Sequence, residues 1–287
     1  MLENCCYDYF ELLTLNLARH GFFGEIVHCE GGYLHQIGES LFHRGERNER
    51  WRLKQNIGRN GNLYPTHGLG PVAQIMNINR GNRMDYMVSV STDDFMMNDT
   101  AKKLARTDDY FEQFVDVPYR GNMNTTTIRT VSGQTIIVQH DVTSPRPYSR
   151  LHLVSGTKGI AQKYPMPSRI AKGHKDWLPE DEFKKLEEEF NPPIISKMRD
   201  MALKIGGHGG MDFLMDWRLM DCLRNGLPVD MDVYDAATWS VISPLSEWSV
   251  ANRSAPIDIP DFTSGAWKKN VPHDISLVKG GTTKVHI

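Results

Sequence analysis

The sequence predicts an α+β fold in which a large, mostly antiparallel sheet is covered on one face by helices. Two observations support this class: segments with strand character are concentrated between residues 24 and 164, and helical periodicity dominates between residues 180 and 249. Strands that precede a block of helices are typical of α+β layers. Because a broad sheet does not leave its second face bare, we expect a partner domain or subunit to cover that face, with a homo-oligomer as the preferred arrangement.

The chain begins with a segment that has helical periodicity. Between residues 9 and 18 the apolar side chains fall at spacings that suit a helix packed on a neighbour. Arg19, His20 and Gly21 provide a C-terminal stop, and residues 24–30 then alternate as a strand. A chain that opens directly into packed elements suggests a missing upstream segment.

The next region mixes loops with short elements. Residues 38–60 are polar and rich in Arg, Asn and Gly, so we expect a long loop that carries Trp51 and Arg52. The other predictions for this region are a helix over 71–79 entered through a turn at Gly68–Gly70, a strand over 84–91, and a lid or surface excursion over 98–115.

A hairpin is the most distinct element, and residues 125–131 and 134–142 form its arms. Ser132 and Gly133 make a two-residue turn whose glycine supplies positive φ. Alternation in the second arm assigns even positions to one face and odd positions to the other. Both faces are apolar near the start and polar near the end, so this strand is expected to run from the core toward a site.

The remaining elements follow from shorter patterns. Strands over 151–154 and 160–164 continue the sheet, and the tail 257–287 is loop-like. The predicted helices are 180–189, 193–205, 211–224 and 233–249, with Pro244 as the expected point of interruption in the last.

Composition argues against several classes of function. The 287 residues carry a net charge of −2 and no cluster of Lys and Arg, so the electrostatic footprint for nucleic acid or anionic membrane is missing. No apolar run approaches the roughly 18 residues of a membrane span, and the first residues lack the regions of a signal peptide. A soluble protein with no nucleic-acid or membrane partner is expected, in a compartment that stays unknown. The four cysteines suit neither a disulfide framework nor a structural zinc site.

The segment Asn60–Pro71 is the strongest candidate for a functional site. It places Tyr64 and His67 three residues apart, among glycines and prolines that fix the backbone path. Tyrosine and histidine together can transfer protons. A structural loop with a buried histidine is the alternative interpretation.

Other motifs are less specific. Residues 68–73 fit the GxGxxG/A dinucleotide pattern, but no hydrophobic strand precedes them, so the chain holds no self-contained nucleotide-binding unit. The turn Gly206–Gly210 leads into a helix N-terminus that either holds an anion or is capped by Asp212. Neither a metal site nor an ordinary pair of glycosidase carboxylates is apparent. The histidines in strand-like runs are assigned to the core by default: His28, His35, His140 and His152.

Seven motifs carry a resemblance to a known family. They are Glu3–Tyr7, Gly24–Tyr33, Trp51–Arg52, Asn60–Asn79, Tyr119–Thr125, Gln139–Tyr148 and Gly206–Asn225. Together they extend over nearly the whole chain, which resembles glycoside hydrolase family 109, the NAD-dependent α-N-acetylgalactosaminidases of the Gfo/Idh/MocA oxidoreductase superfamily.

The resemblance implies a domain boundary. Family members carry an N-terminal dinucleotide-binding domain before this region. Residues 1–22 would correspond to the residual end of that domain, and residues 23–287 to the C-terminal α+β substrate and catalytic domain. The chain alone is then expected to be inactive. The family is bacterial, and the resemblance leaves export as an open expectation.

The resemblance also implies a reaction and its residues. Terminal α-linked N-acetylgalactosamine (GalNAc) would be removed from a glycan by a redox-neutral sequence of oxidation, elimination and water addition with NAD as cofactor, which fits the missing carboxylate pair. His67 and Tyr33 are the expected proton-transfer residues, with their individual roles left open. The expected sugar site comprises Tyr33, Arg52, Tyr64, Pro65, Thr66, His67 and Tyr148. Asn4 and Tyr64 are expected to face the cofactor, and no metal is expected.

Two alternatives stay open. The chain could be a non-catalytic, truncated product that binds sugar or forms oligomers through its sheet. It could also be a sugar or cyclitol dehydrogenase of the same superfamily, which the Tyr-Pro-Thr-His context disfavours.

Overall fold

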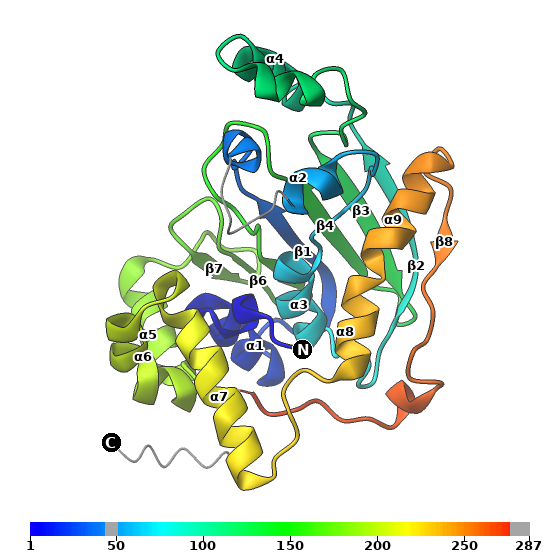
Figure 1. Ribbon diagram of the computed structural model, residues 1–287. Helices are drawn as coiled ribbons and strands as arrows, with labels where there is room; N and C mark the ends of the chain where they lie inside the picture. Colours follow the sequence, from blue (N-terminus) through cyan, green and yellow to red (C-terminus); the bar gives the residue numbers. More distant parts are fainter. Residues whose placement is uncertain (44–50, 276–287) are drawn as a thin grey trace.

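The computed structural model describes residues 1–43 and 51–275, and its centre is one eight-stranded sheet (Figure 1). The strand order is β7-β6-β5-β1-β4-β3-β2-β8. Within the described residues β1 pairs with β4 in parallel and the other pairings are antiparallel, which confirms the predicted sheet type. The strands are β1 (Ile26–Leu34), β2 (Met84–Ser91), β3 (Asn124–Thr130), β4 (Thr135–Asp141), β5 (Leu153–Gly156), β6 (Gly159–Gln162), β7 (Arg169–Lys172) and β8 (Ile257–Asp258).

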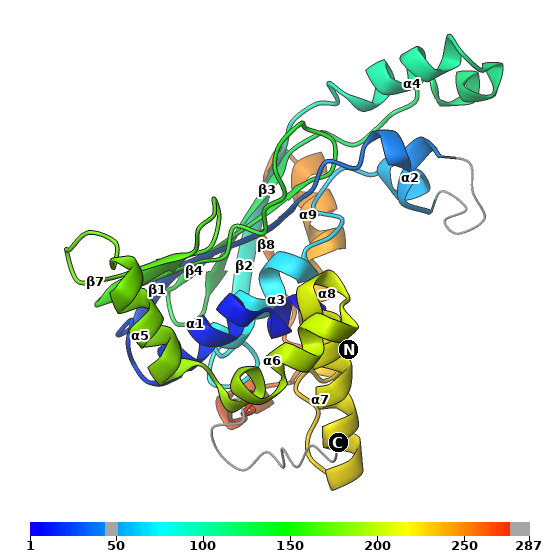
Figure 2. The same cartoon turned by 90° about the vertical axis from the view of Figure 1, so that its left-hand side faces the viewer.

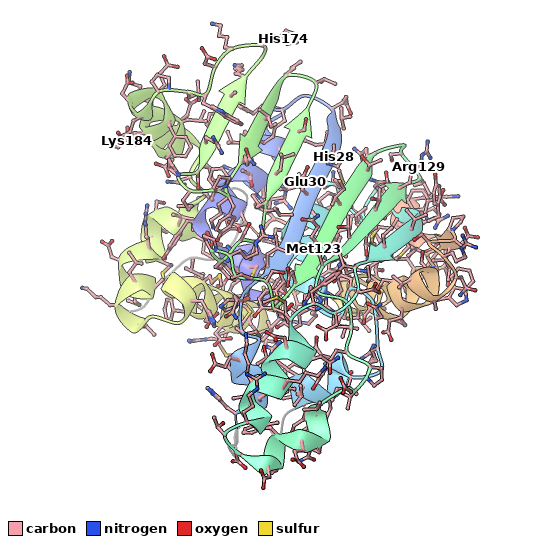
Figure 3. All side chains as sticks on the ribbon, turned by 90° about the horizontal axis from the view of Figure 1, so that it is seen from above. His28, Glu30, Met123, Arg129, His174 and Lys184 are labelled. Atoms are coloured by element: carbon pink, nitrogen blue, oxygen red, sulfur yellow. The ribbon has the colours of Figure 1, made fainter. Side chains whose placement is uncertain are left out.

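Helices cover one face of the sheet, as predicted. Figure 2 shows α1, α3, α6 and α8 on the same side of the strands. Figure 3 looks onto the other face, where it labels His28 and Glu30 of β1 and Arg129 of β3. The α-helices are α1 (Tyr9–Arg19), α2 (Trp51–Asn56), α3 (Thr66–Ile75), α4 (Met97–Ala105), α5 (Glu180–Phe190), α6 (Pro193–Ile205), α7 (Met211–Asn225), α8 (Val233–Ser240) and α9 (Ile242–Ala251). Short 3-10 turns are η1 (Asn4–Tyr7), η2 (Glu39–Phe42), η3 (Asp109–Phe114), η4 (His208–Gly210) and η5 (Ala266–Lys268).

The hairpin of β3 and β4 lies where the alternation predicts it. Ile136 and Val138 are fully buried under the helices, whereas Ile137 on the opposite face is half-buried. Ile136 pairs across the ladder with Ile128, which is also fully buried. Because side chains alternate with a period of two, the apolar positions of one arm fix the buried face of both.

The first helix belongs to the same hydrophobic core as the sheet. Asp8 caps α1 by accepting a hydrogen bond from the amide of Phe10, and Gly21 follows the helix with a φ of 72°. Leu12 and Leu17 are fully buried in the cluster that contains the sheet residues. The boundary at residue 22 stays a prediction, and both sides of it share one core.

The helix predicted over 71–79 begins earlier, at Thr66, and ends at Ile75. Gly68 and Gly70 lie inside it, so they do not form the expected entry turn. A Cβ on Gly68 would overlap the backbone nitrogen of Gly32, and a Cβ on Gly31 would overlap the carbonyl of Gly68. These glycines therefore let the backbones of α3 and β1 touch, which sets the first turn of α3 against the end of β1.

We expect Gly68→Ala to lower the free energy of unfolding by at least about 2 kcal/mol, because the added methyl group must displace backbone rather than a flexible side chain. Denaturant unfolding followed by circular dichroism measures the change. Gly38→Ala is the matched control, since its Cβ would meet Thr143 at an ordinary 3.6 Å. Equal stabilities of the two variants would contradict the close approach.

Several other predictions need correction. The expected loop over 38–60 contains η2 and α2, so Trp51 and Arg52 lie on a short helix, and residues 44–50 lie outside the described residues. The strand predicted over 24–30 runs from Ile26 to Leu34 because the Gly31–Gly32 pair continues the ladder instead of ending it. Residues 98–115 are mostly helical, in α4 and η3.

The C-terminal part shows further differences. The helix predicted over 233–249 is divided at Val241 and not at Pro244, which lies in the first turn of α9, where a missing amide hydrogen costs no helical bond. The strands predicted at 151–154 and 160–164 are β5 and β6, shifted by one or two residues. The prediction omitted β7 and β8, which form the two edges of the sheet. No helix in the described ranges is both long and apolar enough to cross a membrane.

Candidate functional site

Three predicted site residues meet where the end of β1 faces the start of α3. The ring centres of Tyr33 and Tyr64 are 4.8 Å apart, and those of Tyr64 and His67 are also 4.8 Å apart. The ring centre of Tyr33 lies 5.2 Å from that of His67. Pro65 is the N-cap of α3 and Thr66 is its first residue, so they hold Tyr64 and His67 on either side of the helix start. The rings are close enough to contact one hexose.

Glu3 reaches this cluster from the N-terminal turn, although it is not among the site residues predicted from the sequence. Its Oε1 atom lies 2.8 Å from Nδ1 of His67, although the directions of the two groups do not meet hydrogen-bond geometry. The amide of Cys5 donates to the same oxygen. Burial raises the pKa of Glu3, but contacts with His67 and nearby donors outweigh it, and the net pKa lies below the usual value. Glu3 is therefore an anion beside the imidazole, and its place next to Asn4 in the first motif was the available signal.

Asn4 connects the N-terminal turn to the glycine-rich turn before α7. Its side-chain amide donates to Asp212 at 2.6 Å, and His208 Nδ1 lies 2.7 Å from the other carboxylate oxygen of Asp212. Burial raises the pKa of Asp212, but these contacts lower it by more, so the net pKa lies below the usual value. Asp212 is held by these two partners, but it does not cap α7, whose N-cap is Gly210 without a side-chain hydrogen bond, so the predicted cap is wrong.

Arg52 and Tyr64 line a small cavity beside the cluster. The guanidinium carbon of Arg52 lies 5.1 Å from the ring centre of Tyr64 and 4.4 Å from that of Trp51. The cavity, of about 200 Å³, opens between α2 and the end of β4, where His140 contributes to its wall. The cation therefore stands at the edge of the aromatic cluster, as the sugar-site prediction requires.

Tyr148 and His35 close the opposite side. The ring centre of Tyr148 lies 6.4 Å from that of Tyr33 and 4.9 Å from that of His35. The hydroxyl of Tyr33 lies 3.1 Å from His35 Nδ1, within hydrogen-bond distance. His35 was assigned to the core by default, yet it is half-buried and contacts a predicted proton-transfer residue. The two residues are two positions apart, a spacing that places side chains on one face of an extended chain, and this spacing was the available signal.

Burial sets the protonation of the phenols. It raises the pKa of Tyr33 and of Tyr64, while the charge of Arg52 opposes each shift. It raises the pKa of Tyr148 to about 12, against the opposing charge of Arg150. Burial also holds the pKa of His140 well below its usual value. At neutral pH the site therefore offers three phenol donors and a neutral His140 around His67.

The Glu3, Cys5 and His67 ligand atoms all lie within 4.8 Å of one another, close enough to consider a metal. Two observations weigh against that use. Glu3 Oε1 already contacts the Cys5 amide and His67, and burial raises the pKa of the Cys5 thiol well above its usual value, which disfavours the thiolate that metals bind. The expectation that no metal is used stays a prediction.

Comparisons with known proteins match this chain to one family. The model of the glycosyl hydrolase 109 C-terminal domain matches residues 7–269. An α-N-acetylgalactosaminidase of Bacteroides fragilis is 49% identical over 273 residues, covering 94% of this chain and 64% of that protein. A glycosyl hydrolase family 109 protein of Solibacter usitatus is 44% identical over 274 residues, covering 94% and 61%. The chain thus spans somewhat less than two thirds of the length of these curated relatives.

The fold has counterparts among solved structures. A levoglucosan dehydrogenase in complex with NADH and L-sorbose superposes with a TM-score of 0.58 at 15% identity, over 90% of this chain and 66% of that one. At this identity the likeness concerns the fold alone, which is the Gfo/Idh/MocA C-terminal type. The family model and the relatives together show that the chain belongs to glycosyl hydrolase family 109 through its C-terminal domain.

Proposed function

We propose that this chain supplies the sugar-binding and proton-transfer half of an NAD-dependent glycosidase that removes terminal α-linked GalNAc. The observation that carries the proposal is the meeting of Tyr33, Tyr64, His67 and Tyr148 at one end of the sheet, beside the N-terminal turn. The relative named as an α-N-acetylgalactosaminidase supports the choice of substrate.

This chain offers residues for the nicotinamide end of NAD only. Asn4 follows Glu3 in the chain and Tyr64 contacts His67, and both would face the nicotinamide. The described residues contain no glycine-rich turn between a strand and a helix that would hold a pyrophosphate. When bound, NAD would supply reversible hydride acceptance from the sugar. The proposal therefore includes a dinucleotide-binding domain joined before residue 23, and activity that depends on it.

His67 and Tyr33 would move the protons. With Nδ1 of His67 turned to the Glu3 carboxylate, the other ring nitrogen is left for the sugar. Tyr33 is protonated at neutral pH and contacts His35, which offers its hydroxyl a second proton carrier. One of the two would take the proton of the C3 hydroxyl when the sugar is oxidised, and the other would take the proton from C2 in the elimination. Arg52 and Tyr148 would orient hydroxyl or acetamido groups by hydrogen bonding.

The test is hydrolysis of a chromogenic α-GalNAc glycoside by the protein joined to its dinucleotide domain, with and without NAD. We expect release of the chromophore only when NAD is present, with no net NADH formed. Steady accumulation of NADH from free sugars would instead support the dehydrogenase alternative. A folded, full-length protein without either activity would support the non-catalytic alternative.

We also propose that two copies associate through the uncovered face of the sheet. Val88, Ile137 and Leu153 place half-buried apolar side chains on that face among polar neighbours, and Tyr86 is exposed beside them. We expect the wild type to sediment as a dimer and Ile137→Glu to sediment as a monomer, because a buried unpaired charge opposes the contact. Val233→Glu, on the exposed surface of α8, is the control. A monomeric wild type would contradict this arrangement.

A further inference from the structure

A large groove lies outside the site described above. Its volume is about 760 Å³, within the range of ligand-binding clefts. The start of α1, residues 163–169, residues 177–178, α5 and one arginine of α6 form its walls. Figure 3 labels Lys184 on α5, which contributes to the groove beyond the β7 edge of the sheet.

Aromatic side chains line this groove, and Trp177 among them is accessible. Trp177 is 39% exposed, and the guanidinium of Arg169 lies 5.0 Å from the centre of its ring. Tyr9 is contacted in the same way by Arg199 at 4.9 Å. Trp177 therefore keeps exposed ring surface that a ligand can contact.

Charged groups of both signs stand between the aromatic rings. The Nε atom of Arg169 is buried and has no hydrogen-bond partner among the described residues. Burial raises the pKa of Glu187, although Arg199 and Lys184 oppose the shift, which is consistent with a carboxylate that lacks a close ionic partner. The groove therefore places charged donors and an acceptor next to aromatic surfaces.

This combination selects a class of ligand. A purely apolar ligand would bury charges without compensating hydrogen bonds, which is costly. A polyanion would meet the carboxylates of Asp8, Glu180 and Glu187. A carbohydrate suits both features, because its CH faces pack on aromatic rings and its hydroxyl groups both donate and accept hydrogen bonds.

A chain of contacting side chains connects the wall of the groove to the sugar site. Asp8, on the groove wall, lies 2.6 Å from Arg150, and Arg150 donates to the hydroxyl of Tyr148 at 3.2 Å. The ring of Tyr148 in turn lies 6.1 Å from that of Tyr164, which adjoins the groove residue Lys163. These contacts place Tyr148 and Tyr164 between Tyr33 and the groove.

We propose that the groove binds the part of a glycan that lies beyond its terminal sugar, with Trp177 as the stacking platform and Arg169, Arg199 and Glu187 as hydrogen-bonding groups. This inference rests on the proposed function for the position of the terminal sugar. It assigns the specificity for longer glycans to residues that take no part in proton transfer.

Calorimetry on the full chain tests the inference with two probes, methyl α-GalNAc and a trisaccharide that ends in α-linked GalNAc. We expect the trisaccharide to bind roughly tenfold more tightly or better. Trp177→Ala should reduce its affinity to that of the methyl glycoside and leave the methyl glycoside unaffected. Arg169→Ala provides a second variant, and Trp248→Ala, with an equally exposed indole on α9, is the control.

Equal affinities of the two probes in the wild type, including no binding of either, would overturn the inference. An equal loss for both probes in Trp177→Ala would also overturn it. Failure of the proposed function has a different signature, namely no NAD-dependent release from the chromogenic glycoside by the full-length protein, and it leaves the comparison of the two affinities unchanged.

Discussion

His67→Ala, made in the protein joined to its dinucleotide domain, is expected to lower kcat by roughly 10² or more and to leave the affinity for NAD almost unchanged. The imidazole stands between the Glu3 carboxylate and the rings of Tyr33 and Tyr64, where it can transfer a proton to or from the sugar. Alanine removes that group without disturbing the backbone of α3. Steady-state kinetics on the chromogenic glycoside and calorimetry with NAD measure the two effects.

A matched histidine variant separates chemistry from general damage. His174 is exposed after β7 and is labelled in Figure 3, at a distance along the chain from every predicted site residue. His174→Ala should retain wild-type kcat. If His67→Ala retained it as well, His67 would lose its assigned role in proton transfer.

Glu11→Gln is expected to lower the free energy of unfolding by about 3 kcal/mol at pH 7. Glu11 is buried and accepts hydrogen bonds from Arg150 at 2.7 Å and Lys163 at 2.9 Å. Glutamine keeps the shape but removes the charge that balances both cations. This value is at the low end of the range for a broken buried ion pair, because Asp8 still contacts both Arg150 and Lys163. Denaturant unfolding measures the change, and Asp181→Asn, whose carboxylate is exposed 3.7 Å from Lys185, is the control.

The pH dependence of that difference gives a second check. Burial raises the pKa of Glu11, but Lys163 and Arg150 lower it more, so the net pKa lies well below its usual value. Such a group stabilises the folded state above the unfolded pKa of about 4.3, and the contribution is lost as the pH falls through the folded pKa. The difference between wild type and Glu11→Gln should therefore be constant from pH 7 to about 5 and shrink below about 4. A difference that grows as the pH falls would contradict the ion-pair explanation.

The fold class could be predicted because it depends on periodicity. Alternation in residues 134–142 fixed the buried face of β4, and the grouping of strands before helices indicated the layers. The start of α3 was missed because Gly68 and Gly70 are read as breakers from local propensity. The reason for glycine is tertiary at both positions: Gly68 lets α3 touch β1, and a Cβ on Gly70 would crowd Cys6, Glu3 and Trp239. The edge strands β7 and β8 span four and two residues, too few to show a period.

The sequence indicated the residues that form the aromatic cluster, but the prediction omitted two residues that contact them. The Tyr-Pro-Thr-His motif identified a Tyr and His pair that does lie in one cluster, and the family resemblance added Tyr33, Arg52 and Tyr148. Glu3 and His35 were not selected. The contact of Glu3 with His67 joins segments that meet only in the folded chain, so no spacing in the sequence could indicate it. His35 lies two residues after Tyr33, and this spacing was the signal that could have selected it.

Calorimetric titration of NAD into this chain alone is the most direct test of the central claim, which is that the chain contains the sugar-binding domain but not the dinucleotide-binding domain. The absence of a glycine-rich dinucleotide motif in the described residues predicts no binding tighter than about 1 mM, since only the nicotinamide end has residues to contact. A dissociation constant near 1 μM would mean that these residues hold the whole dinucleotide, and would contradict the account.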